Sequence, residues 1–211
     1  MVTRHEFLAR LHHLLTPRGY LEIGVQFGDS LKLASCPAVG IDPHPHVGRE
    51  IPNAVIAPMT SDLYFRTHEP PFPVDLAFID GSHLYEDALR DFMNIESHSN
   101  PKTVVVFDDV LPYNQEIASR NQPPGDWTGD VWKIIPVLAN WRPDLDTMLV
   151  DVFPTGALVV WGLEDINLTL SLNYSNIVLP EMVDWTVPDE ILFRTDAITA
   201  DEAIDRLKGQ L

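Results

Sequence analysis

Four residues in the middle of the chain could do acid–base or metal chemistry: Asp80, His83, Asp108 and Asp109. Carboxylate oxygens suit a hard divalent cation such as Mg²⁺, and three neighbouring carboxylates repel one another unless a cation lies between them. The sequence therefore predicts a Mg²⁺ site formed by the three aspartates. His83 would lie beside the cation as a proton acceptor, so Asp80 and His83 are the predicted catalytic residues.

The surrounding sequence predicts that these residues converge. Residues 76–79 and 103–107 are apolar runs that are too short for helices, and each is followed directly by aspartate. Residues 84–98, between them, have helical spacing, so the whole stretch reads as a strand, a helix and a parallel strand. In a parallel sheet the carboxyl ends of such strands face one ligand crevice. We assign the charged residues of the helix to its solvated face: Glu86, Asp87, Arg90 and Asp91.

A second candidate site precedes this unit. Residues 20–28, YLEIGVQFG, predict a strand and a turn with glycines at 24 and 28, and Asp29 or Ser30 is expected to cap a short helix. Such a turn lets a ligand approach the backbone closely. The turn lacks the GxGxxG pattern of pyrophosphate binders, so NAD fits poorly. A tight turn without any ligand remains the alternative.

Two further strand ends extend this candidate site. Asp42 ends the predicted strand 39–41 and follows Gly24 by 18 positions, a spacing typical of an acid that binds ribose hydroxyls. Residues 53–57 predict a third strand, and the polar loop after it could reach a base or an amine: Thr60, Ser61 and Asp62. His44 and His46 lie among prolines, so we expect a solvated loop rather than a metal site there.

The remaining segments predict the frame of the site. Residues 4–15 have helical spacing, and residues 111–129 form a long polar loop with the character of a lid. Residues 130–141 predict a helix kinked or broken at Pro136. Residues 147–153 and 157–161 predict a hairpin whose second strand is antiparallel to the sheet. Beyond it we expect a helix at 164–173, an irregular stretch at 176–193 and a helix at 200–208 capped by Thr199 or Asp201.

Composition narrows the classes of function. The 211 residues carry a net charge of −17 with 45% hydrophobic residues, and the pI is near 4.6. This charge opposes binding to nucleic acid or to anionic lipid. The single cysteine, Cys36, excludes an intramolecular disulfide, and the chain has no apolar run long enough for a membrane span and no signal-peptide pattern. We therefore expect a soluble, cytoplasmic protein.

Four motifs together resemble the class I S-adenosylmethionine-dependent methyltransferases: LEIGVQFGDS, GIDP, DLAFIDGSHLYEDALRDF and VVVFDDV. More narrowly, they resemble the metal-dependent O-methyltransferase branch that includes macrolide-sugar and rhamnosyl enzymes. The resemblance spans roughly residues 20–161, and FIDGSHxYE is its most specific part. It implies a Rossmann-like, doubly wound, mostly parallel seven-stranded α/β sheet with the last strand antiparallel. Residues 1–162 would form the methyltransferase core, and residues 163–211 an extension that packs on the core or on a dimer partner.

The resemblance also implies roles for particular residues. S-adenosylmethionine would bind at Glu22, Gly24, Gly28, Ser30, Asp42, Thr60, Ser61, Asp62 and Asp80. Mg²⁺ would be held by Asp80, Asp108 and Asp109, with His83 as the base. Catechol-type enzymes have an amide where this chain has Asp109, so the more anionic site agrees better with the sugar-modifying branch.

The favoured function is methyl transfer to a hydroxyl of a small natural product, such as a sugar. A metal-independent N- or O-methyltransferase is one alternative, and a non-catalytic nucleoside-binding module is another. We also expect a homodimer, because the segment after residue 162 is rich in apolar side chains.

Overall fold

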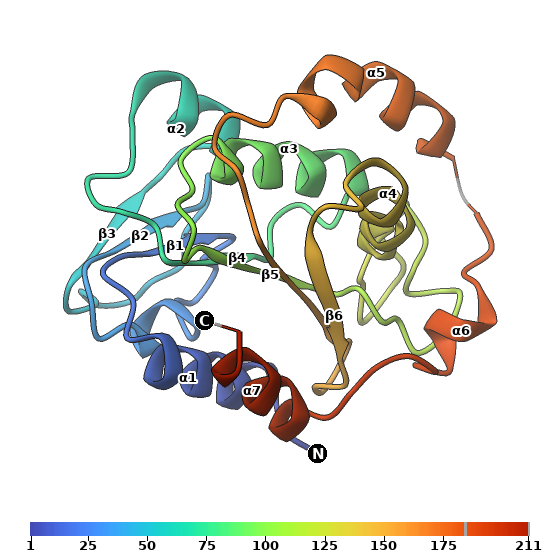
Figure 1. Cartoon of the computed structure of the whole chain (residues 1–211), viewed down its shortest axis with the longest axis horizontal. Helices are drawn as coiled ribbons and strands as arrows, with labels where there is room; N and C mark the ends of the chain where they lie inside the picture. Colours follow the sequence, from blue (N-terminus) through green and yellow to red (C-terminus); the bar gives the residue numbers. More distant parts are fainter. Residues whose placement is uncertain (184, 211) are drawn as a thin grey trace.

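A seven-stranded sheet forms the middle layer of the computed structural model, which describes residues 1–183 and 185–210 (Figure 1). The strand order is β3-β2-β1-β4-β5-β7-β6. All neighbours are parallel except β7, which is antiparallel to both β5 and β6. The strands are β1 (Tyr20–Ile23), β2 (Ala38–Ile41), β3 (Ala54–Ala57), β4 (Leu76–Ile79), β5 (Val104–Asp108), β6 (Asp146–Val150) and β7 (Ala157–Trp161). The predicted fold class is therefore confirmed.

Helices cover both faces of the sheet. In Figure 1, α2, α3, α4 and α5 lie above the sheet, and α1 and α7 lie side by side below it. The helices are α1 (Arg4–Leu15), α2 (Ser61–Thr67), α3 (Tyr85–Glu96), α4 (Ile134–Trp141), α5 (Thr169–Glu181), α6 (Asp189–Leu192) and α7 (Ala200–Lys208), with 3₁₀ turns η1 (Leu31–Leu33) and η2 (Val131–Lys133). Because the central strands are covered on both faces, β1, β2, β4, β5 and β7 are buried throughout.

The chain reverses its direction of winding between β1 and β4, and this junction creates the site. The two strands are adjacent and parallel, so their carboxyl ends meet. Gly24 follows β1 with φ +91°, and a Cβ there would lie 1.7 Å from the carbonyl oxygen of Asp80. Only glycine allows the two strand ends to approach this closely.

Two acids of α3 are buried, contrary to the solvated face that we expected. The exposed fractions are 7% for Glu86 and 3% for Asp91. Glu86 accepts two hydrogen bonds from the guanidinium of Arg120, at 2.6 and 2.9 Å. Asp91 lines the cavity beside Ser61. Contacts with residues outside the helix therefore decide which of its acids are buried, and the charge pattern along the helix does not.

Two local predictions were also imprecise. Ser30 does not cap η1 with its side chain; instead its hydroxyl donates to Oε1 of Glu22 at 2.8 Å. Residues 130–141 form a 3₁₀ turn followed by α4, and Pro136 is the third residue of that α-helix. A proline in the first helical turn loses no intrahelical hydrogen bond, so it does not break the helix.

The segment after residue 162 differs most from expectation. We expected a helix at 164–173 and an irregular stretch at 176–193, whereas α5 covers residues 169–181 and α6 follows. Only Leu170, Ile177 and Val178 of α5 are buried, and exposed leucines at other positions hide the helical period. Position 184, within the predicted irregular stretch, lies outside the described residues.

The C-terminal helices pack on the sheet layers of the same chain. The buried residues of α5 belong to the same core cluster as α3 and α4. Helix α7 packs against α1 and β6, and Thr199 caps it with a reciprocal hydrogen-bond pair to Glu202, as predicted. The boundary at residue 162 and the homodimer stay predictions. Within residues 1–183 and 185–210, no helix is long and apolar enough to cross a membrane.

Candidate active site

The turn after β1 forms part of the wall of a large cavity. Gly24 lines this cavity, whereas Gly28, also with positive φ, packs its Cα toward Ile51 and Val47 and does not line it. At Gly24 the predicted cofactor turn therefore brings the backbone directly to the wall of the cavity. Gly28 contributes through the shape of the turn.

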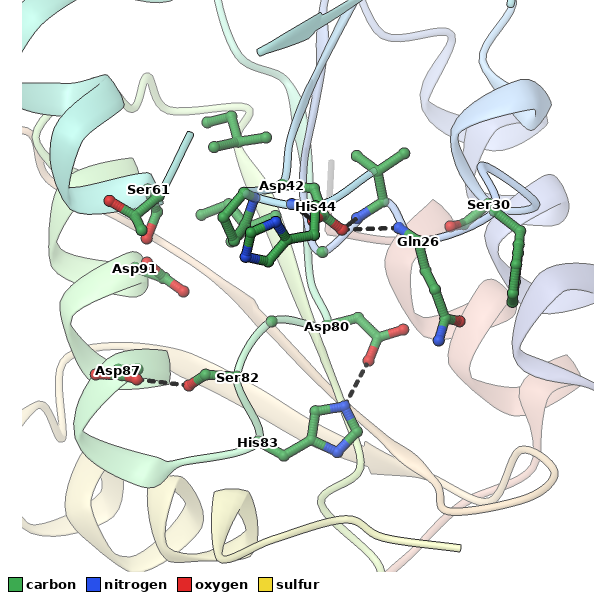
Figure 2. Close-up of a pocket in the computed structure, with 18 of the residues that line it drawn as sticks. Gln26, Ser30, Asp42, His44, Ser61, Asp80, Ser82, His83, Asp87 and Asp91 are labelled. Atoms are coloured by element: carbon green, nitrogen blue, oxygen red, sulfur yellow. Dashed lines mark hydrogen bonds and ion pairs between the residues drawn. The ribbon is translucent and has the colours of Figure 1, made fainter. Parts of the chain in front are cut away.

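Asp42 braces this turn (Figure 2). One of its oxygens accepts hydrogen bonds from the backbone N–H groups of Val25 and Gln26 at 2.9 and 2.8 Å. The other oxygen accepts from the N–H of His44 at 2.7 Å. Each carboxylate oxygen has two lone pairs, so Oδ2 is fully used and Oδ1 of Asp42, which lines the cavity, retains capacity to accept one hydroxyl hydrogen.

Glu22 lies beneath the cavity rather than on its wall. Its carboxyl group is fully buried and accepts from Tyr20 Oη at 2.6 Å and from Ser30 Oγ at 2.8 Å. Burial raises the pKa of Glu22 to about 8, although both hydrogen bonds act in the opposite direction. Glu22 thus reaches the cavity only through Ser30, which lines it.

The far end of the cavity is formed by α2 and α3. Thr60 caps α2, accepting from the N–H of Leu63 at 3.3 Å, and Thr60, Ser61 and Asp62 all line the cavity. In Figure 2, Asp91 lies opposite Ser61. Burial raises the pKa of Asp91 to about 7, so this carboxyl group is partly protonated near neutral pH.

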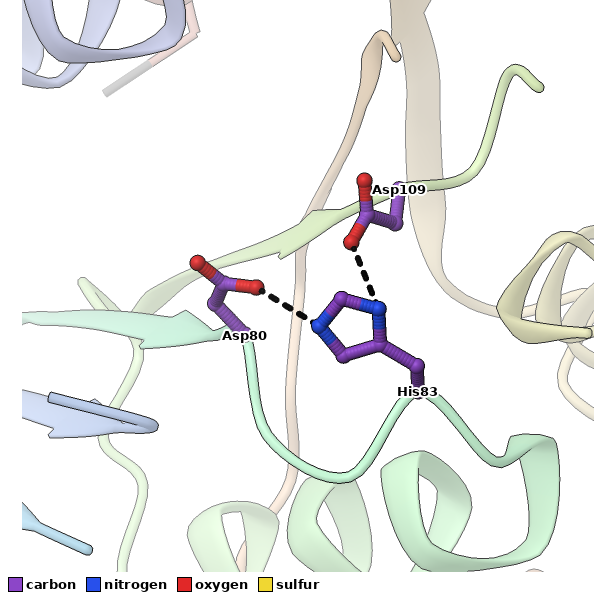
Figure 3. A group of neighbouring side chains, drawn as sticks. All are labelled: Asp80, His83 and Asp109. Carbon is purple, nitrogen blue, oxygen red and sulfur yellow. Dashed lines mark ion pairs between the residues drawn. The ribbon is translucent and has the colours of Figure 1, made fainter. Parts of the chain in front are cut away.

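His83 lies between two carboxylates, as Figure 3 shows. Its Nε2 is 3.5 Å from Oδ1 of Asp80, and its Nδ1 is 3.2 Å from Oδ2 of Asp109. Ligand atoms of these three residues all lie within 4.8 Å of one another. His83 and Asp109 both adopt positive φ, at 59° and 63°. The surrounding structure must hold the backbone in this uncommon conformation at both residues.

Asp108 has a different partner. Its Oδ2 pairs with Nη1 of Arg4, the first residue of α1, and its Oδ1 is buried without a hydrogen-bond partner. The same Arg4 nitrogen is 3.8 Å from Oδ2 of Asp80. The structure thus brings Asp80 and Asp109 around His83, while Asp108 faces Arg4.

Charge and burial shift the pKa values of this cluster in opposite directions. Burial and the charge of Asp80 raise the pKa of Asp109 to about 6, and burial with both neighbouring aspartates raises that of Asp108. Burial alone would lower the pKa of His83, but its hydrogen bond to Asp80 and the two carboxylate charges raise it to about 9. In this arrangement His83 is protonated at neutral pH and cannot accept a proton.

The long loop after β5 contacts the cluster through Trp127. The indole stacks on the His83 ring at 5.1 Å and 17°, and the Trp127 carbonyl oxygen lies 2.7 Å from Nδ1 of His83. Arg120 ties the loop to Glu86, as described above, and Tyr113 is exposed and donates to Asp126 at 2.8 Å. Trp127 therefore fixes the orientation of His83, which leaves Nε2 toward Asp80.

One cavity of about 630 Å³ joins these parts. Its wall includes every predicted cofactor residue except Glu22 and Gly28, and it includes His83 but neither Asp108 nor Asp109. A second space of about 10 Å³, the size of a single water or small ion, is bordered by all three aspartates and His83.

Sequence reasoning missed several residues of the site, and three of them carry titratable or charged side chains next to the predicted residues. Arg4, His5 and Asp91 all line the cavity. A signal existed for two of them. Arg4 lies three and four positions before Phe7 and Leu8 on the buried face of α1, and Asp91 lies four positions before Ile95 on the buried face of α3. A charge on an apolar helix face needs a partner or a ligand.

Comparison with known proteins agrees with this geometry. Residues 21–110 match the family described as a methyltransferase domain. No curated protein sequence gives a significant match.

Solved structures share the fold at low sequence identity. The O-methyltransferase from Bacillus cereus in complex with SAH is 17% identical, with 75% of this chain and 80% of that chain covered and a TM-score of 0.58. TomG from Streptomyces achromogenes, an O-methyltransferase of tomaymycin synthesis in complex with SAM, is 19% identical, with 76% and 79% covered and a TM-score of 0.60. Cofactor-bound Rv0187 from MTB is 18% identical, with 76% and 80% covered and a TM-score of 0.62. Residues 21–110 are therefore similar to a methyltransferase domain, and the chain shares its fold with these solved O-methyltransferase structures.

Proposed function

We propose that the protein transfers a methyl group from S-adenosylmethionine to a hydroxyl of a small molecule, with a divalent cation such as Mg²⁺ at the acidic cluster. The continuous cavity carries this proposal, because it connects the turn at Gly24 and Asp42 with Asp80 and His83. A volume of about 630 Å³ is in the range that binds a cofactor and a small acceptor together. The acidic wall and the net charge of −17 disfavour a nucleic-acid acceptor.

The chain offers a distinct group for each part of the cofactor. We propose that Asp42 accepts a hydrogen bond from a ribose hydroxyl and that the backbone at Gly24, with Ser30 above Glu22, holds the methionine end. Thr60, Ser61 and Asp62, with Asp91 behind Ser61, would surround the adenine. When bound, S-adenosylmethionine supplies an electrophilic methyl group on a sulfonium. The cofactor-binding residues would orient this methyl group toward Asp80 and His83.

The acidic cluster fits a hard divalent cation. Oxygen donors of Asp80 and Asp109 lie close together, the buried Oδ1 of Asp108 has no partner, and an ion-sized space borders all three. We propose these three aspartates as the residues that would hold it. Bound there, Mg²⁺ would lower the pKa of an acceptor hydroxyl.

His83 is the proposed proton acceptor. Trp127 and Asp109 hold its Nδ1 side, so Nε2 is the atom left to take a proton beside Asp80. In the arrangement described, the carboxylates keep His83 protonated. A divalent cation would compensate their charge, lower the pKa of His83 and free Nε2 for this role.

The loop of residues 112–129 is the proposed cover for the acceptor, with Trp127 as its aromatic contact. Its interactions with Glu86 and His83 make it a fixed wall near the cluster. The acceptor class remains a small natural product such as a sugar. A cytoplasmic location and a homodimer are also part of this proposal.

One observation favours a second candidate, a metal-independent methyltransferase. Arg4 and His83 already place positive charge beside all three aspartates. In that case the acids would serve to position these two residues.

The test is a screen of methyl transfer against hydroxylated metabolites, with Mg²⁺ and with a chelator. We expect turnover that requires Mg²⁺. The variant Asp109→Asn should reduce turnover to background while SAH binding, measured by calorimetry, stays within about threefold, because Asp109 does not line the large cavity. Full turnover in chelator, retained by Asp109→Asn, would support the metal-independent enzyme instead. No SAH binding by the wild type would contradict both.

A further inference from the structure

Arg4 is built into the acidic cluster from the opposite face of the sheet. It belongs to α1, whose buried residues Phe7 and Leu8 pack below the sheet, whereas His83 precedes α3 above it. The pair between Arg4 and Asp108 joins residues 104 positions apart in the chain. No neighbouring residue of α1 contacts the aspartates in the interactions described, so the contact depends on Arg4 alone.

The backbone around Arg4 is fixed. Thr3 forms a capping box with Glu6 and an isolated β-bridge with Phe153. The N–H of Arg4 donates to the carbonyl oxygen of Phe153 at 3.0 Å, and the N–H of Phe153 donates to Val2 at 2.9 Å. These contacts fix the position of the Arg4 backbone at the edge of the cluster.

The position of the guanidinium resembles that of a bridging cation. A single nitrogen, Nη1, pairs with Oδ2 of Asp108 and lies 3.8 Å from Oδ2 of Asp80. The other oxygen of Asp80 faces His83, and the other oxygen of Asp108 has no partner. Arg4 therefore occupies two of the oxygens that a divalent ion would otherwise use.

We propose that Arg4 is a permanent counter-ion that competes with divalent cations for Asp80 and Asp108 and so sets the affinity of the cluster for them. This inference rests on the proposed metal site. When ionised, the three carboxylates carry −3, and Arg4 with protonated His83 carries +2, so the net charge is −3 + 2 = −1. Without Arg4 the net charge is −2, so the cluster attracts a divalent ion more strongly and offers it both oxygens of Asp108.

The experiment is calorimetric titration of the full chain with MnCl₂, which needs no acceptor. Arg4→Gln and Arg4→Met remove the charge, and Met retains the apolar stem in case the Gln variant does not fold. Both should bind Mn²⁺ roughly 10- to 100-fold more tightly than the wild type, the effect of removing a unit charge several Å from a divalent ion. Arg4→Lys keeps the charge and should stay within about threefold of the wild type.

Arg10→Gln is the matched control, because it removes the same charge from the same helix. Arg10 pairs with Asp201 at 2.5 Å, on the exposed surface. Its Mn²⁺ affinity should equal that of the wild type. Equal or weaker Mn²⁺ binding in Arg4→Gln and Arg4→Met, or no Mn²⁺ binding in any variant, would overturn the inference. SAH binding to the same samples tests the cofactor site separately, so a failed metal inference leaves the methyltransferase proposal standing.

Discussion

The two halves of the large cavity solve the problem of buried polar groups differently. Near the ends of β1 and β2, Glu22 and Asp42 both have hydrogen-bond partners within the protein. Asp42 accepts from three backbone N–H groups, and Glu22 accepts from two hydroxyls. At the ends of β4 and β5 three carboxylates crowd together, and one buried oxygen of Asp108 has no partner.

This difference separates a preformed half from a half that depends on cations. Neutral and charge-assisted hydrogen bonds fix the first half without any ligand. The second half carries unfavourable charge, which Arg4 and His83 partly offset, and burial together with this charge raises the pKa values of Asp108 and Asp109. Changes in the second half should therefore affect chemistry most, and changes in the first should affect binding and stability.

The largest effect is expected at the catalytic end. His83→Ala should lower methyl transfer by roughly 10²–10⁴-fold, the usual contribution of a positioned base. Without a divalent ion the pKa of His83 is about 9, so the metal-independent candidate predicts a rate in chelator that rises as pH increases toward 9. With added Mg²⁺, the pH at which the rate is half-maximal should be lower, because the ion lowers the pKa of His83. The rate is measured as SAH release, and His13→Ala, an exposed histidine of α1, is the control. An unchanged rate in His83→Ala would remove it from the mechanism.

A smaller effect is expected in the preformed half. Asp42→Ala should weaken SAH binding by about 1–3 kcal/mol, because it removes both the proposed ribose contact and the brace of the turn. Asp42→Asn keeps one acceptor oxygen, so its affinity for SAH should lie between those of the wild type and Asp42→Ala. Calorimetry measures both. Tighter binding of NAD than of SAH, or no loss in Asp42→Ala, would contradict the proposed cofactor site.

The smallest effect concerns stability. The pKa of Glu22 is raised to about 8, so between about pH 4.5 and 8 the folded state holds a proton that the unfolded state has lost. The free energy of unfolding should therefore fall as pH rises through this window. Glu22→Gln cannot ionise, so its melting temperature should decrease less between pH 5 and pH 9 than that of the wild type. Parallel pH profiles of the two proteins would show that Glu22 is ionised at neutral pH.

The arrangement of the strand ends could be predicted because it depends on local patterns. Short apolar runs, each followed by a polar residue, mark Asp42, Asp80 and Asp108 as strand ends, and parallel strands bring such ends to one edge. The antiparallel β7 followed from its hairpin with β6. Glycine at position 24 was predicted to let a ligand approach the backbone; the structure shows that the carbonyl oxygen of Asp80 lies close to it, and the approach of a ligand stays a prediction.

The bounds of α5 could not be predicted in the same way, whereas α7 covers the predicted residues 200–208. In α5 only a few residues face the core, and apolar side chains such as Leu172 and Leu179 are exposed. The hydrophobic period is then too weak to indicate where the helix begins. Packing against α3 and α4 decides it instead.

The sequence by itself determined the strands, the edge of the sheet at which their carboxyl ends meet, and the acids at those ends. The tertiary structure alone decided which charges those acids meet. Arg4 reaches Asp108 across 104 positions, and Arg120 reaches Glu86 across 34. Such pairs form between elements that periodicity treats separately, and their partners are selected by burial, because a charge removed from water must find an opposite charge in whatever element packs beside it.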